Sequence, residues 1–233
     1  MTSDDTSAGR VLTRREAVVL LGLAGAGLLA PGAAGAQAAA CVVRPQQTEG
    51  PFYVDEGLER SDIRSDPQSG EVRPGAPLAL AFAVSALRGS ACAPLAGAVV
   101  DVWHCDALGA YSDVGGATAG QKFLRGYQVT DATGLVRFTT IYPGAYPGRA
   151  VHIHFKIRTG ASAPRGHEFT SQVYFDDALT DEVHALEPYA RRGQPRLRNE
   201  RDGLFRRGGR QLVLPAAGDG AGYAGTFALA LSL

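Results

Sequence analysis

Apolar residues in much of this chain come in short runs, each about the length of a β-strand and bounded by glycine or proline. The 30 glycines and 13 prolines favour many turns over a helix bundle. The expected strands cover residues 78–84, 98–103, 126–130, 135–141, 150–157, 169–175, 211–214 and 226–233. The pattern predicts an all-β fold, a β-sandwich with long active-site loops and little helix.

Two local patterns refine that expectation. Asp131-Ala-Thr-Gly134 lies between two of the runs and predicts a hairpin loop. Helical periodicity is confined to about residues 178–192, where Val183, Leu186 and Tyr189 recur at helical spacing. No internal repeat or linker divides the chain after residue 38, so residues 39–233 are expected to form one catalytic domain.

The first forty residues have the layout of an export signal. The pair Arg14-Arg15 precedes a short apolar run that ends near Leu29, and a small-residue stretch through Ala36-Gln-Ala38 follows. This order is typical of a secretory signal, and the arginine pair resembles a twin-arginine signal. An N-terminal membrane anchor is the alternative, disfavoured by the short run. We expect residues 1–38 to be an export signal and the protein to be periplasmic or extracellular, with no stable membrane span.

Three cysteines follow the expected signal: Cys41, Cys92 and Cys105. An exported chain can oxidise them, and an odd number permits one disulfide and one free thiol. Cys41 and Cys92 are one candidate pair, which the sequence does not establish. None of the three lies in a close Cys-x-x-Cys pair, so a metal site built on cysteine is not expected.

The sharpest local signal is His152-Ile-His154 within an expected strand. Residues two apart in a strand project from the same face, so both imidazoles can reach one metal ion. The alternative is a pair of ordinary strand histidines with hydrogen-bonded rings. No acidic residue lies in the six positions before His152, but Tyr146 does, and Tyr142 lies just upstream. A tyrosine coordinates only after losing its proton, so a site of two histidines and two tyrosines favours Fe³⁺ over Zn²⁺ or Cu⁺.

Four segments carry a more specific pattern: residues 48–53 (TEGPFY), 100–112 (VDVWHCDALGAYS), 142–155 (YPGAYPGRAVHIHF) and 170–175 (TSQVYF). Together, and in this order, they resemble the intradiol ring-cleavage dioxygenases, the non-haem Fe(III) family that includes protocatechuate and catechol dioxygenases. Each segment alone is a weak match, whereas four in register are specific.

The resemblance implies a function and a set of site residues. The function is intradiol cleavage of a catechol-type aromatic 1,2-diol by O₂, giving a cis,cis-muconate-type product without an organic cofactor. Tyr146 is implied to leave the metal and accept a proton, Arg149 to stabilise negative charge on the substrate, and Gln172 to hydrogen-bond the reacting group. The implied Fe(III) ligands are Tyr111, Tyr146, His152 and His154.

The chain departs from the family pattern around the expected pocket. Only five residues separate Tyr146 from His152, with Gly148 after Pro147, and Phe52 stands where the family often has a tyrosine. These changes predict a more open pocket and leave the identity of the diol undetermined. If a substrate carboxylate is bound, the candidate partners are Arg125, Arg158 and Arg165.

Charge limits the partners. With 23 basic and 23 acidic residues, the chain lacks the excess of positive charge that nucleic-acid binding requires. A small aromatic diol and O₂ are the expected partners, for a monomer or a homodimer. Two other functions remain open: an exported copper- or zinc-binding β-sandwich of the superoxide dismutase or cupredoxin type, and a non-enzymatic module that binds a cell-surface polymer. The first needs further His, Cys or Met ligands, and Met1 is the only methionine.

Overall fold

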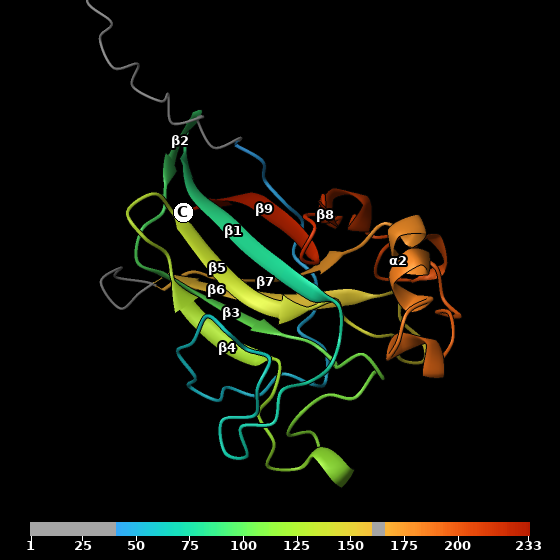
Figure 1. Ribbon diagram of the computed structural model, residues 1–233. Coiled ribbons are helices and arrows are strands. Elements are labelled where there is room, and N and C mark those ends of the chain that lie inside the picture. The colour runs from blue at the N-terminus through green and yellow to red at the C-terminus, as the bar shows by residue number, and fades with distance from the viewer. Residues whose placement is uncertain (1–40, 160–165) are drawn as a thin grey trace, which may run out of the picture. The chain divides into compact units, whose positions relative to one another are not determined.

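Two β-sheets packed face to face form the framework of the computed structural model, which describes residues 41–159 and 166–233 (Figure 1). The expected export signal and Arg165 lie outside these residues. The five-stranded sheet contains β1 (Pro77–Arg88), β2 (Ala91–Pro94), β5 (Leu135–Ile141), β8 (Ala217–Gly218) and β9 (Tyr223–Ser232). The four-stranded sheet has the order β4 (Arg125–Val129), β3 (Ala98–Trp103), β6 (His152–Thr159), β7 (Glu168–Tyr174). The predicted all-β sandwich with little helix is confirmed.

The core lies between the two sheets and is rich in phenylalanine. Phe82 of β1 lies 5.0 Å from Phe155 of β6 and 6.1 Å from Phe227 of β9, measured between ring centroids. Phe138 of β5 meets Phe82 edge-on at 6.3 Å. All four rings are almost fully buried. Each large ring removes extensive apolar surface from water, which stabilises the sandwich and fixes β6 in place.

The predicted hairpin around Asp131–Gly134 is wrong, although the turn itself forms. β4 pairs with β3, whereas β5 pairs with β1, so the chain changes sheet at this turn. The Asp131 carboxylate accepts hydrogen bonds from the backbone N–H groups of Thr133 and Leu135. These bonds close the turn without cross-strand pairing, and each flanking strand gains a partner in its own sheet.

Two further expectations need correction. Residues 211–214 are not a strand: the 3₁₀ helix η4 (Gly209–Leu212) contains the first two of them, and only Val213 makes a bridge, to Tyr174. Gly208 adopts a left-handed conformation, with φ of 97°, and turns the chain there. The helix expected over 178–192 is divided into α2 (Asp177–His184) and η2 (Tyr189–Arg191), because Pro188 cannot continue a helical hydrogen-bond pattern.

The remaining helical elements are short. Two 3₁₀ helices, η1 (Gly116–Thr118) and η3 (Asn199–Arg201), lie in long loops. Within the described ranges, no helix is long and apolar enough to cross a membrane. The helical segments between β7 and β8, including α2, gather at one end of the sheets, where Figure 1 shows α2 in orange.

The segment before β1 covers the face of the four-stranded sheet that points away from the core. Cys41 is joined to Cys92 of β2 by a disulfide, the pairing that the sequence left open, and Cys105 is free and buried. From there the chain passes β7, where the Gln47 N–H donates to the Thr170 carbonyl over 2.9 Å. Both faces of this sheet are therefore shielded from water in its central part.

Candidate metal centre

A row of side chains crosses the covered face of the four-stranded sheet. The strand register places His154 of β6 opposite Trp103 of β3 and opposite Gln172 of β7, and His152 opposite Tyr174. All five side chains are almost completely buried. Because side chains alternate along a strand, His152 and His154 share this face while Ile153 and Phe155 enter the core.

The two imidazoles converge. The Nε2 atoms of His152 and His154 lie 3.0 Å apart. His152 Nδ1 is 2.6 Å from the carbonyl oxygen of Ala150, which can only accept, so Nδ1 carries the proton and Nε2 keeps a lone pair. The Trp103 ring stacks on the His154 ring, with centroids 5.0 Å apart and planes 7° from parallel. The bond to Ala150 orients the His152 ring and the stacking orients the His154 ring, so that both Nε2 atoms point toward one place.

Tyr146 approaches the same point from the loop after β5. Its Oη lies 3.1 Å from His152 Nε2. The loop is pressed against the turn that follows β3, because at Gly144 a Cβ atom would lie only 2.4 Å from the carbonyl oxygens of Asp106 and Ala107. Only glycine allows this close approach.

Tyr111 completes the cluster from the turn that follows β3. The Asp106 carboxylate caps that turn by accepting hydrogen bonds from the Leu108 and Ala110 N–H groups. The Tyr111 ring lies 5.6 Å from the Tyr146 ring and 6.4 Å from the His154 ring. Its Oη is buried and has no hydrogen-bond partner among the described residues. The structure thus brings together all four residues that the sequence indicated as metal ligands.

Burial sets the protonation of these donors. Desolvation, with a smaller contribution from the Arg149 guanidinium, lowers the pKa of His152 to about 3 and holds that of His154 well below its usual value. Burial also raises the pKa of Tyr111 well above 10 and raises that of Tyr146. Without a metal, the site consists of two neutral imidazoles and two protonated phenols.

This donor set fits a trivalent cation. Ionising two buried phenols requires a strong positive charge at their oxygens, and two phenolates would balance two of the three charges of Fe³⁺. Tyr111 Oη, which has no hydrogen-bond partner among the described residues, is one oxygen that could bind such a cation. Nowhere in residues 41–159 or 166–233 do three His, Cys, Asp or Glu side chains gather as a copper or zinc site would require. His104, another buried histidine, already contacts the Cys105 carbonyl and Thr140 Oγ1 with its two ring nitrogens.

Arg149 and Gln172 border the four donors. Arg149 Nη2 donates to Gln172 Oε1 over 2.5 Å, and Arg149 Nη1 lies 3.4 Å from His152 Nε2. Gln172 Nε2 in turn donates to the Thr48 carbonyl over 3.1 Å. The sequence prediction that both residues lie at the site agrees with this geometry, which puts a fixed positive charge beside the imidazoles.

Asp202 is a site residue that the sequence analysis missed. Its Oδ2 accepts from Arg149 Nε over 2.8 Å and from the Ala150 N–H over 2.9 Å, and its side chain is 1% exposed. Fifty-three positions separate it from Arg149, and no motif surrounds it. The contact arises only when the loop after η3 packs against the start of β6, so no sequence signal could have indicated it.

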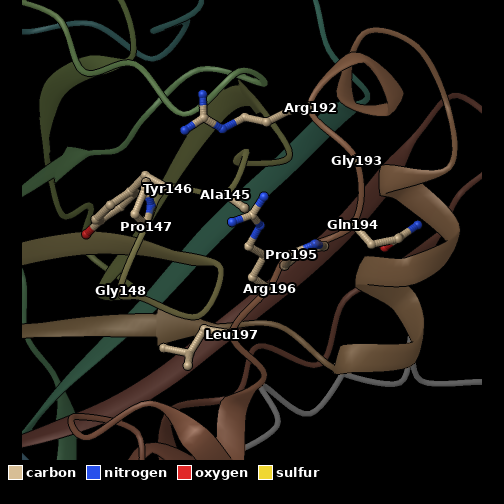
Figure 2. A pocket seen from close by; sticks show the side chains of 10 residues that line it. All are labelled: Ala145, Tyr146, Pro147, Gly148, Arg192, Gly193, Gln194, Pro195, Arg196 and Leu197. Atoms are coloured by element: carbon tan, nitrogen blue, oxygen red, sulfur yellow. The ribbon is translucent and has the colours of Figure 1, made fainter.

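A cavity of about 440 Å³ adjoins the cluster on the outer side of Tyr146, between residues 145–148 and 192–197 (Figure 2). Pro147 and Gly148 of the short loop lie exposed at its edge. Neither Arg125 nor Arg158 lines it, contrary to their suggested role. Arg125 is buried and donates to Ser112, and Arg158 forms ion pairs with Asp55 and Asp101.

Comparisons with known proteins agree with this geometry. The model of the Dioxygenase family, Dioxygenase_C, matches residues 48–202. Catechol 1,2-dioxygenase 1 of Acinetobacter lwoffii is 30% identical over 142 residues, which cover 51% of this chain but only 43% of that enzyme. The chain thus matches less than half the length of this curated relative.

Solved structures extend the similarity over most of the chain. An intradiol ring-cleavage dioxygenase from Tetranychus urticae superposes with a TM-score of 0.72 at 29% identity, covering 82% of this chain and 95% of that one. The dioxygenase domain of a dioxygenase–carbohydrate-binding fusion from Streptomyces sp. SirexAA-E gives a TM-score of 0.59 at 31% identity, covering 82% and 99%. With the family match spanning more than half of its residues, this chain belongs to the intradiol ring-cleavage dioxygenase family.

Proposed function

We propose that this protein cleaves a catechol-type 1,2-diol with O₂ at a non-haem Fe(III) centre, between the two hydroxyl-bearing carbons. The product is of the cis,cis-muconate type. The observation that carries the proposal is the convergence of Tyr111, Tyr146, His152 and His154 on one buried point. Both atoms of O₂ enter the product, so the reaction needs no external reductant and no organic cofactor.

The four convergent side chains would hold the metal. When bound, Fe³⁺ would supply a Lewis acid that takes up both diol oxygens and makes the ring reactive toward O₂. The neutral imidazoles and the two phenol oxygens suit this cation, as argued from their burial and protonation.

We infer that Tyr146 accepts a proton from the diol. It is only partly buried and borders the open cavity, whereas Tyr111 is 4% exposed and enclosed by Phe52, whose ring stacks on it at 4.5 Å. A phenolate that can move outward can take a proton at Oη, while an enclosed one stays in place. Tyr111 and the histidines therefore form the fixed part of the site.

Arg149 would stabilise the negative charge that develops on the ring. Its guanidinium is positioned before substrate arrives, by Asp202 on one side and Gln172 on the other. A preorganised positive charge in a desolvated site costs no reorganisation during the reaction. Gln172, fixed by Thr48, would orient the reacting group through its amide.

We also propose that the protein is exported, by the twin-arginine route. The layout of residues 1–38 supports this, and so does the disulfide between Cys41 and Cys92, because such bonds persist in oxidising compartments. All four donors come from one chain, so the site needs no second subunit, whether the protein is a monomer or a homodimer.

Colour tests the proposed function. The iron-loaded protein should absorb visible light through charge transfer from tyrosinate to Fe³⁺, and Tyr146→Phe should shift or bleach this band. Tyr142→Phe is the matched control, because Tyr142 lies four positions away and hydrogen-bonds Thr180 instead. An oxygen electrode with a panel of catechols should record one O₂ consumed per diol. A colourless protein with full iron occupancy would overturn the proposal.

A further inference from the structure

Two arginines, Arg192 and Arg196, line the cavity beside Tyr146. Arg192 and Arg196 are both exposed, and neither forms an ion pair or side-chain hydrogen bond with any described residue. The neighbouring Arg191, which lies outside the cavity lining, instead pairs with Glu187 at 2.7 Å. The cavity wall thus carries two unneutralised positive charges next to a residue of the candidate metal centre.

Arg192 lies against both loops that supply the phenols. A Cβ atom built on Gly109, in the turn leading to Tyr111, would lie 3.4 Å from Arg192 Nε and 2.3 Å from the Ala145 carbonyl oxygen. In Figure 2 the guanidinium groups of Arg192 and Arg196 extend toward Ala145 and Tyr146, while the Gln194 side chain points away from them. The Tyr146 hydroxyl lies on the side of its ring that faces away from both arginines. The two charges therefore stand on the opposite side of the Tyr146 ring from its hydroxyl, in the wall of the cavity that Tyr146 also lines.

The size of the cavity exceeds the needs of a bare ring. A dry cavity of about 150 Å³ is sufficient for benzene, whereas this one measures about 440 Å³. The short loop from Tyr146 to Arg149 leaves it open at Pro147 and Gly148. A substituent that extends from the ring past Tyr146 has both room and a charged wall to meet.

We propose that Arg192 and Arg196 are specificity-determining residues that bind the carboxylate of an anionic side chain carried by the diol ring. This rests on the proposed function, since the metal donors would hold the diol end of the same molecule. A carboxylate accepts two parallel hydrogen bonds from one guanidinium, which suits a planar anion on a flexible arm.

The experiment compares an acid with its uncharged counterpart. Dihydroxyphenylpropionate, its methyl ester and unsubstituted catechol are tested on the iron-loaded protein, on Arg192→Gln, on Arg196→Gln and on the double variant. Binding is measured by calorimetry without O₂, and cleavage is measured separately with an oxygen electrode. Arg191→Gln is the control for loss of an exposed arginine outside the cavity.

We expect each single variant to weaken binding of the acid roughly fivefold, and the double variant more than tenfold, since each contact is partly solvated. Binding of the ester and of catechol should change by less than about twofold, and Arg191→Gln should match the parent. Equal losses for acid and ester, or no loss for either, would overturn the assignment. Cleavage of catechol without any preference for the acid would overturn this inference alone. Tight, arginine-dependent binding of the acid with no cleavage of any diol would support the anion site and overturn the proposed function.

Discussion

The two faces of β6 are equally buried, but they differ in whether their buried polar atoms have hydrogen-bond partners. Ile153 and Phe155, on one face, are 0% exposed, and His152 and His154, on the other, are 1% exposed. The apolar face packs against rings from the opposite sheet. On the polar face, His154 Nδ1 and the nearby Tyr111 Oη have no hydrogen-bond partner within the described ranges. A buried polar atom without a hydrogen-bond partner destabilises a fold unless a bound group satisfies it. Two such atoms close together therefore indicate a binding site more specifically than burial alone does.

The largest expected effect comes from the polar face. His154→Leu removes one donor and should abolish iron retention and lower the turnover rate at least ~1,000-fold, since several kcal/mol of metal-dependent stabilisation would be lost. The iron-free variant should remain within about 1 kcal/mol of the iron-free parent in urea unfolding, because His154 Nδ1 has no partner among the described residues and Nε2 contacts only His152 Nε2. Iron content and oxygen uptake measure the first effect. A variant that retains full iron and colour would contradict the role of this face.

The apolar face should behave in the opposite way. Phe155→Ala removes a ring that packs against Phe82 and Phe227 and should lower the free energy of unfolding by about 3–5 kcal/mol. The folded, iron-loaded fraction should keep the visible band of the parent. Urea unfolding and absorption spectra test both statements, with Phe155→Leu as the milder control. Loss of the band in folded protein would show that the two faces are not independent.

Asp202 connects the site to the loop after η3, and its effect should be smaller. Asp202→Asn keeps the shape but weakens the hold on Arg149, so kcat should fall about 10- to 100-fold. Asp181→Asn, which affects an ion pair with Arg198 away from the site, is the control. Unchanged kcat in Asp202→Asn would exclude a positioning role.

The pH dependence of the Asp202 variant sharpens the same prediction. Burial alone would raise the pKa of Asp202, but hydrogen bonds from Ala150 and the charge of Arg149 hold it below 3.8. A depressed pKa contributes stability above the unfolded value of 3.8, and this contribution is lost as the pH falls through the folded value. The stability difference between the parent and Asp202→Asn should therefore be constant near neutral pH and shrink in acid. Thermal unfolding at several pH values measures it.

The smallest effect should come from Lys156, which lies two residues beyond His154 on the same face of β6. Lys156 Nζ lies 2.7 Å from Glu49 and 3.2 Å from Glu168, and both carboxylates are largely exposed. Burial alone would lower the lysine pKa, but the two carboxylates raise it above 10.5. This stability is present at neutral pH and lost only as the pH rises through the folded pKa. Lys156→Met should cost less than about 1 kcal/mol, and melting temperatures at neutral and strongly alkaline pH should show the parent and variant converging.

Much of the polar face could be predicted because its information is local. The expected strands at 98–103 and 135–141 match β3 and β5, and the spacing of His152 and His154 alone places both imidazoles on one face. Contacts between residues far apart in the sequence could not be predicted in this way. The turn at Asp131–Gly134 has the residues of a hairpin, yet which strand β5 pairs with is decided by the core. Asp202 meets Arg149 only through tertiary packing, and Arg192 and Arg196 reach the cavity only because the segment after η2 folds against residues 145–148.

The disulfide has a consequence for how the protein is best prepared. Cys41 and Cys92 are 51 positions apart, and the enclosed stretch contains Gly50, which lies against the His154 ring, and Thr48, which fixes Gln172. In the chain-entropy account, a disulfide that closes a loop of that length lowers the conformational entropy of the unfolded chain. This raises the free energy of the unfolded state by about 4 kcal/mol. Material made in a reducing cytoplasm would keep its sheets but hold this stretch less firmly. Without the disulfide, the protein would then retain metal and substrate poorly. A thiol titration before any kinetic assay would distinguish such a reduced preparation from an inactive enzyme.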